Sequence, residues 1–215
     1  MTLGEFHQLV GDSLRRGTTL STQIANATRL AVTWLERNYT FKHMEVFRLF
    51  QLVEGARTLD LPTNSVVKAH KFLRLVNTDG TYTQLNRVEP EDIGGLRSST
   101  NAAGDTVPAR YWVVGNSTIV FDAVSSATLN GEAMFYVYSD WPRADSETHS
   151  LLTTASDVLL WQTLMNMAVF LKDAEMAQAN KLLRDEALNT LVRAEDENKY
   201  GGESLTMAFI PQSLR

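Results

Sequence analysis

The sequence predicts an α+β fold, in which helices from both ends of the chain form a bundle and an antiparallel β domain is inserted between them. In residues 1–40 and 145–199, apolar residues recur at the three- and four-residue spacing of helices. Residues 41–144 instead contain short β-branched and aromatic runs separated by Gly, Asn and Asp. The chain has 215 residues, of which 44% are hydrophobic and 21% charged, as expected for a globular protein with a core. A short arm, residues 200–215, follows the last helix.

The first 40 residues predict two helices. Thr2 is positioned to cap the first, and Gly17 is expected to end it. Ser21 is expected to cap the second helix, which should close at Asn38 and Tyr39. The apolar residues that define the face of the first helix are Leu3, Phe6, Leu9, Val10 and Leu14.

The middle of the chain predicts strands joined by turns. Glu54-Gly55 and Gly115-Asn116 are expected to form hairpin turns, and Asn77–Thr81 is expected to form a turn with Asp-Gly at its tip. Pro90–Ile93 predicts one helical turn, and Arg97–Thr106 a polar loop. The ends of this region should lie close together. The expected strands are 46–52, 56–61, 66–76, 111–114, 118–121 and 133–138.

Leu151–Lys199 is the longest helical segment. Thr154 and Asp157 have the spacing of a capping box. Val158–Leu171 is apolar nearly all round and must be covered on more than one side. The length favours two antiparallel helices over one continuous helix, with Asp173 as the N-cap of the second. The expected apolar stripe of the second helix is Met176, Ala179, Leu183, Ala187, Leu191 and Ala194.

The C-terminal arm begins with Gly201-Gly202 and carries an apolar patch before Pro211. It is too short to form a core of its own. It folds back on its parent domain, adds as an extended strand or arm to a neighbouring chain, or has no fixed structure.

Composition excludes several classes of protein. A net charge of −5 argues against a sequence-reading DNA-binding protein. The chain has no cysteine, so it has no disulfide, thiolate metal site or cysteine nucleophile. Its N-terminal segment does not have the pattern of a signal peptide. The longest uncharged apolar run, Val158–Leu171, has 14 residues and is too short to span a bilayer. We therefore expect synthesis in the cytosol and no membrane partner.

Motifs for catalysis are missing from the sequence. The four histidines, His7, His43, His70 and His149, have no helical zinc spacing, and no P-loop, G-x-S-x-G or G-x-G-x-x-G sequence occurs. We therefore predict no catalytic residue, no cofactor and no metal. The β region is rich in aromatic residues, which either fill a small core or form a stacking platform for a sugar or base. These residues are Tyr111, Trp112, Phe121, Phe135, Tyr136, Tyr138 and Trp141.

A family pattern emerges from the order of these segments. The residues that carry it are Leu9, Leu14, Ile24, Trp34-Leu35-Glu36, Phe47, Gly55, Leu59-Asp60-Leu61-Pro62, Pro108, Tyr111, Tyr136, Tyr138, Trp141-Pro142, Leu159-Leu160-Trp161, Ala168, Leu171-Lys172-Asp173, Gln178, Leu182, Ala187-Leu188 and Leu191. Over residues 3–199 the chain resembles the head–tail adaptor (connector) proteins of tailed bacteriophages. It departs from them in the longer, more polar segment 96–107 and in having no proline after Phe121.

The resemblance implies a structural virion protein at the head–tail junction, not an enzyme. The resemblance implies that the subunits form a homo-oligomeric ring, a dodecamer, beneath the portal protein. The ring extends the DNA channel, through which genomic DNA passes without sequence-specific contacts, and docks tail or nozzle proteins. The C-terminal arm, residues 201–215, would reach the portal. The candidate contacts with a neighbouring subunit or the portal are Leu205, Met207, Phe209, Ile210, Trp161 and Met165.

Two other classes remain open at this stage. A β-sandwich module could use its aromatic residues to hold a carbohydrate or peptide, and would then be a monomer with affinity in the isolated region 41–145. A hydrolase would need a pocket with a perturbed acid or histidine.

Overall fold

The computed structural model describes residues 1–15, 17–60, 66–77, 80–92, 98–100, 106–115 and 118–200. The chain divides into two compact units. We call Met1–Lys42 together with the chain from Trp141 onward the helical unit, and His43–Asp140 the β unit. Helices and sheets are both present, so the mixed α+β class is confirmed.

The helical unit begins with α1 (Leu3–Ser13), which Thr2 caps as predicted. The Glu5 amide donates to the Thr2 hydroxyl at 3.2 Å, and the Thr2 amide donates to the Glu5 carboxylate at 2.8 Å. This reciprocal capping box satisfies two amides that the first helical turn leaves without partners. The predicted end at Gly17 is wrong. The helix stops at Ser13, and Arg15 adopts a left-handed conformation with φ of 53°.

A short 3-10 helix, η1 (Gly17–Leu20), leads into α2 (Ser21–Asn38). Ser21 is the first residue of α2, and Leu20 occupies the cap position without a side-chain hydrogen bond, so the predicted serine cap is wrong. The predicted close at Asn38 and Tyr39 is confirmed, because Tyr39 is the C-cap and its amide donates to the Leu35 carbonyl.

The C-terminal part contains α3 (Ser150–Thr154), α4 (Ser156–Leu171) and α5 (Ala174–Tyr200). The prediction of two long helices in place of one is therefore confirmed. Asp173 caps α5 as expected, since its carboxylate accepts from the Met176 amide at 2.9 Å. The predicted capping box is wrong, because Thr154 ends α3 and its hydroxyl donates to the Ser150 carbonyl.

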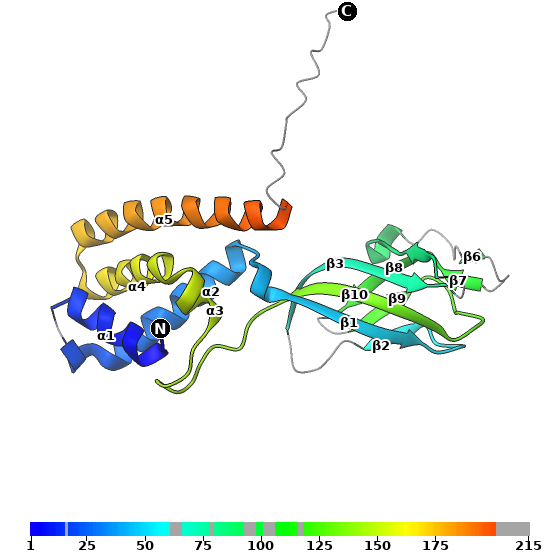
Figure 1. Ribbon diagram of the computed structural model, residues 1–215, viewed down its shortest axis with the longest axis horizontal. Coiled ribbons are helices and arrows are strands. Elements are labelled where there is room, and N and C mark those ends of the chain that lie inside the picture. Colours follow the sequence, from blue (N-terminus) through cyan, green and yellow to red (C-terminus); the bar gives the residue numbers. More distant parts are fainter. Residues whose placement is uncertain are drawn as a thin grey trace, which may run out of the picture. The chain divides into compact units, whose positions relative to one another are not determined.

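The helices of this unit pack around α4, which contacts both α2 and α5 (Figure 1). Helix α1 contacts α2 and α4. The start of α1 is also held by the backbone that precedes α3. The Leu3 and Gly4 amides donate to the Glu147 and Asp145 carbonyls, each at 2.9 Å. The two ends of the chain therefore contribute to one packed set of helices. No helix in the described ranges is both long and apolar enough to cross a membrane.

The β unit contains two four-stranded sheets and a two-stranded ribbon (Figure 1). One sheet is antiparallel, in the order β1 (Glu45–Leu52), β10 (Leu129–Val137), β3 (Val67–Val76) and β4 (Tyr82–Gln84). The other has the order β2 (Thr58–Asp60), β9 (Thr118–Phe121), β8 (Arg110–Val114) and β5 (Asn86–Arg87). The ribbon pairs β6 (Ser98–Thr100) with β7 (Thr106–Pro108). Short 3-10 helices occur at Lys42–Met44 (η2) and Pro90–Asp92 (η3).

Several local predictions for this region are confirmed. The chain turns after Asn77 into β4, and Gly80 has the positive φ of 81° that such a turn requires. Strands β8 and β9 pair on either side of Gly115, whose φ is 62°. The helical turn predicted from Pro90 is η3. The two ends of the unit also lie on neighbouring strands, since Glu45 pairs with Tyr136.

Three other predictions for this region are wrong. The chain does turn at Gly55, but β1 and β2 lie in different sheets, so no hairpin forms there. The ends of the predicted loop Arg97–Thr106 pair with each other as part of β6 and β7. The domain is also not purely antiparallel, because β5 pairs parallel with β8 through Asn86 and Arg87.

Three of the six aromatic residues singled out in the β unit fill its core, and Trp112, Tyr136 and Tyr138 are half-buried. Tyr111, Phe121 and Phe135 are buried together with the leucines of both sheets, which confirms the core interpretation for these three. Trp112 is half-buried, and the Arg57 guanidinium lies 5.7 Å from its ring. Trp141 belongs to the helical unit, where its ring centre is 5.0 Å from that of His149.

Candidate subunit interface

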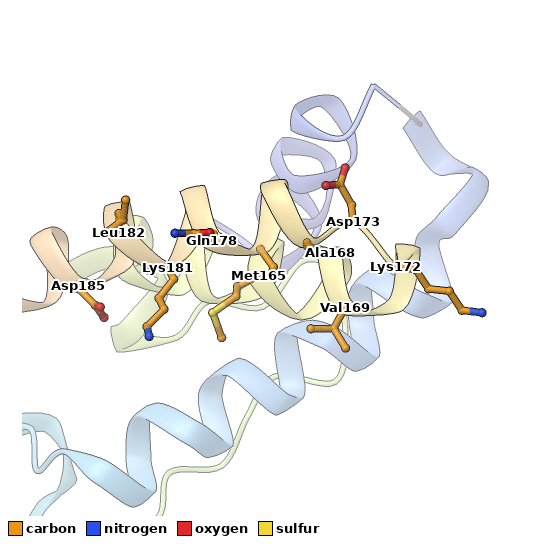
Figure 2. A pocket seen from close by; sticks show the side chains of 11 residues that line it. Met165, Ala168, Val169, Lys172, Asp173, Gln178, Lys181, Leu182 and Asp185 are labelled. Carbon is orange, nitrogen blue, oxygen red and sulfur yellow. The ribbon is translucent and has the colours of Figure 1, made fainter.

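The helical unit has a largely apolar groove between α4 and α5, with a volume of about 770 Å³ (Figure 2). Helix α4 contributes Met165, Ala168 and Val169 to it. The connection and α5 contribute the rest of the lining. These residues are Lys172, Asp173, Ala174, Ala177, Gln178, Lys181, Leu182 and Asp185.

The geometry of the α4–α5 connection explains why the groove begins there. Lys172 takes a left-handed conformation with φ of 58°, and the Asp173 amide donates to the Ala168 carbonyl at 2.9 Å. Asp173 caps α5, which begins at Ala174. The chain therefore reverses within two residues, Lys172 and Asp173. The small side chains of Ala168, Ala174 and Ala177 leave space between the two helices at this end.

Large apolar side chains stand in solvent at and beside the groove. Val169 is 70% exposed and Leu182 is 67% exposed, and both line it. Phe170, the neighbour of Val169 on α4, is also exposed. Contiguous exposed apolar surface on a soluble protein commonly marks a place where another molecule binds. A flank of α4 is thus left uncovered by the described residues of one copy.

The side of α5 that faces α4 carries polar residues where the sequence predicts an apolar stripe. Asn180, Arg184 and Leu188 are buried, whereas Ala179 and Leu183 of the predicted stripe are exposed. The predicted stripe is therefore wrong. Buried charge is tolerated only where it is paired and hydrogen-bonded, and the partners of Arg184 lie on two other helices and on its own.

Arg184, which is only 8% exposed, makes three kinds of contact. Its Nη1 donates to the Gln162 side-chain oxygen on α4 at 2.8 Å, and its Nε donates to the Asp185 carboxylate at 2.9 Å. Its guanidinium carbon lies 4.6 Å from the centre of the Trp34 ring on α2, which is the geometry of a cation–π contact. One side chain therefore joins three helices.

The network continues from Gln162 into α2. The Gln162 amide donates to Asn166 at 3.1 Å, and the Asn166 amide donates to the Ala27 carbonyl at 3.0 Å. These bonds have directions that apolar packing lacks, so they determine the rotation of α4 relative to both neighbours. The network thereby determines which flank of α4 remains exposed.

The charged side chains around the groove differ in whether they have a hydrogen-bond or ion-pair partner. Asp173 accepts a hydrogen bond from the Met176 amide, and Asp185 pairs with Arg184. Lys172 and Lys181 are exposed, and neither forms an ion pair with any residue in the described part of the chain. Figure 2 shows these two lysines on either side of Met165 and Val169. The groove therefore presents an apolar strip with a lysine at each end, and the Asp173 carboxylate lies beside Lys172.

The residues predicted to contact a neighbour fall into two groups. Trp161 and Met165 are half-buried on α4, and Met165 lines the groove with its sulfur 3.7 Å from Arg184 Nη1. Leu205, Met207, Phe209 and Ile210 lie outside the described residues. No contact role was predicted for Val169, Leu182 or Lys181, because their exposure depends on which side of each helix is buried.

The described histidines hold structural positions in their own units. His149 caps α3, accepting from the Leu151 amide at 3.1 Å, and His7 Nδ1 lies 3.8 Å from Asp145. In the β unit, His70 lies between the rings of Tyr111 and Phe135. Burial, with the nearby Arg87 charge, lowers the pKa of His70 to about 4, so the ring is neutral at physiological pH.

Comparison with known proteins agrees with the expectation from the residues. No curated protein matches this chain. The family model described as SU10 adaptor protein matches residues 1–206, which is nearly the whole chain. The chain belongs to the SU10 adaptor protein family, as expected for a head–tail adaptor of a tailed bacteriophage.

Proposed function

We propose that this protein forms a homo-oligomeric ring, a dodecamer, between the portal protein and the tail at the head–tail junction of the virion. In this proposal the helices from both ends of the chain form a bundle domain, and the β domain is inserted between them. Membership of the adaptor family over residues 1–206 is the observation that carries the proposal.

The exposed flank of α4 supports assembly into a ring. A contact between two different surfaces of the same chain repeats around an axis, and it closes a ring when the rotation is right. The groove supplies one such surface, with Val169 and Leu182 left exposed by the part of the chain that the structure describes. Covering these side chains stabilises the assembly without any change in the fold of the subunit.

The charge of the chain suits a channel for DNA. A net charge of −5 per copy repels phosphate weakly, and a dodecamer carries twelve times that charge. Genomic DNA then passes through without sequence-specific contacts and without sticking. The face of the ring away from the portal would dock tail or nozzle proteins.

The C-terminal arm is proposed to reach the portal through Leu205, Met207, Phe209 and Ile210. Deleting residues 203–215 should abolish portal binding and leave the protein folded. The measurement is a pull-down with purified portal protein, and circular dichroism serves as the control for folding. Retained binding by the folded deletion variant would contradict a role for the arm.

Ring formation is tested by electron microscopy and light scattering of the purified protein, alone and with portal protein. Rings, or rings only when portal protein is added, are the expected result. A stable monomer that ignores the portal protein would overturn the proposal. The alternative β-sandwich binding module has less support, because Tyr111, Phe121 and Phe135 are buried and cannot form an open stacking surface.

A further inference from the structure

The outer face of α1 combines one exposed leucine with two carboxylates. Glu5, Leu9 and Asp12 are spaced by four and three residues, so they lie on one side of the helix. All three are exposed, and Leu9 is 41% exposed. The opposite face, which includes Phe6 and Val10, is buried in the helical unit.

The two carboxylates of this face differ in the partners that they have within one copy. Glu5 accepts a hydrogen bond from the Thr2 amide within the capping box. Asp12 forms no ion pair with a residue of the described ranges. The exposed Leu9 side chain between the two carboxylates is accessible to another molecule.

The α4–α5 groove has an apolar strip with a lysine at each end, of which Lys172 has Asp173 beside it. Met165 and Val169 form the strip, and Lys172 and Lys181 stand at its two ends (Figure 2). Lys181 comes seven residues after Ala174, the first residue of α5, which places it roughly 10 Å along the helix axis. Glu5 and Asp12 are also seven residues apart, again roughly 10 Å.

We infer that the outer face of α1 in one copy docks into the α4–α5 groove of the next copy. Leu9 then contacts Met165 and Val169, Asp12 pairs with Lys181, and Glu5 lies beside Lys172. The inference rests on the proposed ring and identifies the two surfaces that meet in it.

The positions of these surfaces allow every copy to use both at once. Helix α1 packs on α2 and α4, whereas α5 packs on α4 from another side (Figure 1). A copy can therefore offer α1 to one neighbour and its groove to the other. Such a head-to-tail contact is the kind that generates rings. The charged ends contribute mainly to register and partner choice, while burial of the apolar strip drives association.

The absence of cysteine from the chain makes the contact directly testable. The variant D12C/K181C is assembled with purified portal protein and treated with a short bis-maleimide linker. A linker suits the test because an ion pair holds two backbones farther apart than a disulfide does. The expected result is a ladder of covalent dimers, trimers and larger species on a denaturing gel. The control variant T33C/K181C places one thiol on the exposed outer side of α2 and should yield at least tenfold less cross-linked product.

Reversing the charges gives a second, independent readout. K181E should reduce the fraction of subunits in rings at least tenfold at low salt, and D12K added to K181E should restore it. Circular dichroism of each variant shows whether it is folded. Normal rings from K181E together with no ladder from D12C/K181C would overturn the proposed contact and leave the ring intact. No rings from the unmodified protein with portal protein would overturn the ring proposal and the contact with it.

Discussion

The buried Arg184 provides the sharpest test of how the helical unit is held together. Arg184→Ala removes the donor to Gln162, which is itself buried on α4. Losing a hydrogen bond from a charged donor to a buried group destabilises a protein by about 1.5–3 kcal/mol. Losing the stacking on Trp34 adds about 0.5–2 kcal/mol. The pair with half-buried Asp185 adds less than about 1 kcal/mol. We therefore expect a loss of about 2–6 kcal/mol in the free energy of unfolding.

The assay is urea unfolding followed by circular dichroism at a helix-sensitive wavelength, which reports mainly on the helical unit. Arg193→Ala is the matched control, because Arg193 is an exposed arginine on the same helix. That control should change the free energy of unfolding by less than about 0.5 kcal/mol. A result for Arg184→Ala equal to that for Arg193→Ala would refute the claim that the network positions α4.

A double variant separates the loss of a charge from the loss of a partner. Arg184→Met keeps most of the volume but leaves the Gln162 oxygen buried without a donor. Replacing both partners by apolar residues of similar shape is often nearly neutral. Arg184→Met with Gln162→Leu should therefore recover part of the stability lost by Arg184→Met alone, because Asn166 also loses its Gln162 donor. Equal stabilities for the single and double variants would show that the Gln162 oxygen finds another donor.

Three further predictions concern other parts of the fold. Gly131→Ala places a methyl group within the ring of Phe50, so it should destabilise the β unit by about 1–3 kcal/mol in thermal unfolding. Adding Phe50→Leu should relieve the clash, and equal melting temperatures for Gly131→Ala and the wild type would contradict it. The pKa of His70 is lowered from 6.5 to about 4 in the folded state, so the unfolded chain binds more protons between these values, and stability should fall as pH drops from 6.5 towards 4. His70→Gln should lessen this fall between unfolding midpoints measured at pH 7 and pH 5, and an unchanged pH dependence would argue against it. Asp173→Ala removes the α5 cap and should destabilise the helical unit by about 1 kcal/mol in urea unfolding, whereas Asp173→Asn should be nearly neutral.

Local signals in the sequence predicted local structure well. Thr2 and Asp173 were identified as caps because a cap depends on amides only two or three residues away. The hairpins around Gly80 and Gly115 were predicted for the same reason, since positive φ at a turn favours glycine. At Thr154, however, the capping-box pattern gave a wrong prediction. Thr154 lies at the end of the short helix α3, where its hydroxyl donates to the Ser150 carbonyl.

Contacts between residues that are distant in the sequence could not be predicted. The run from Glu45 to Leu52 looks like one half of a hairpin, but its partner is β10, and no short-range pattern indicates that pairing. The face of α5 was misjudged because periodicity counts apolar residues only. Asn180 and Arg184 occupy the buried face, and their burial depends on partners such as Gln162 on another helix.

The candidate interface was predicted only in part for the same reason. Apolar residues all round α4 indicated that more than one side is covered, and Met165, which was predicted to contact a neighbouring subunit or the portal, lines the groove. Which flank stays open depends on how α2 and α5 pack against α4. The exposure of Val169 and Leu182 follows from that packing and from no feature of their local sequence.

The pairing of β1 with β10 has a consequence for how the chain is made. Glu45 lies opposite Tyr136, and on the helical side the Ala27 carbonyl accepts from Asn166, 139 residues later. A ribosome releases the N-terminal segments first, so β1 and α2 emerge long before their partners exist. A nascent chain that ends before Leu129 contains neither β10 nor α4, so neither unit can close during most of translation. Both units therefore become complete only late in synthesis, and such long-range closure makes folding slow.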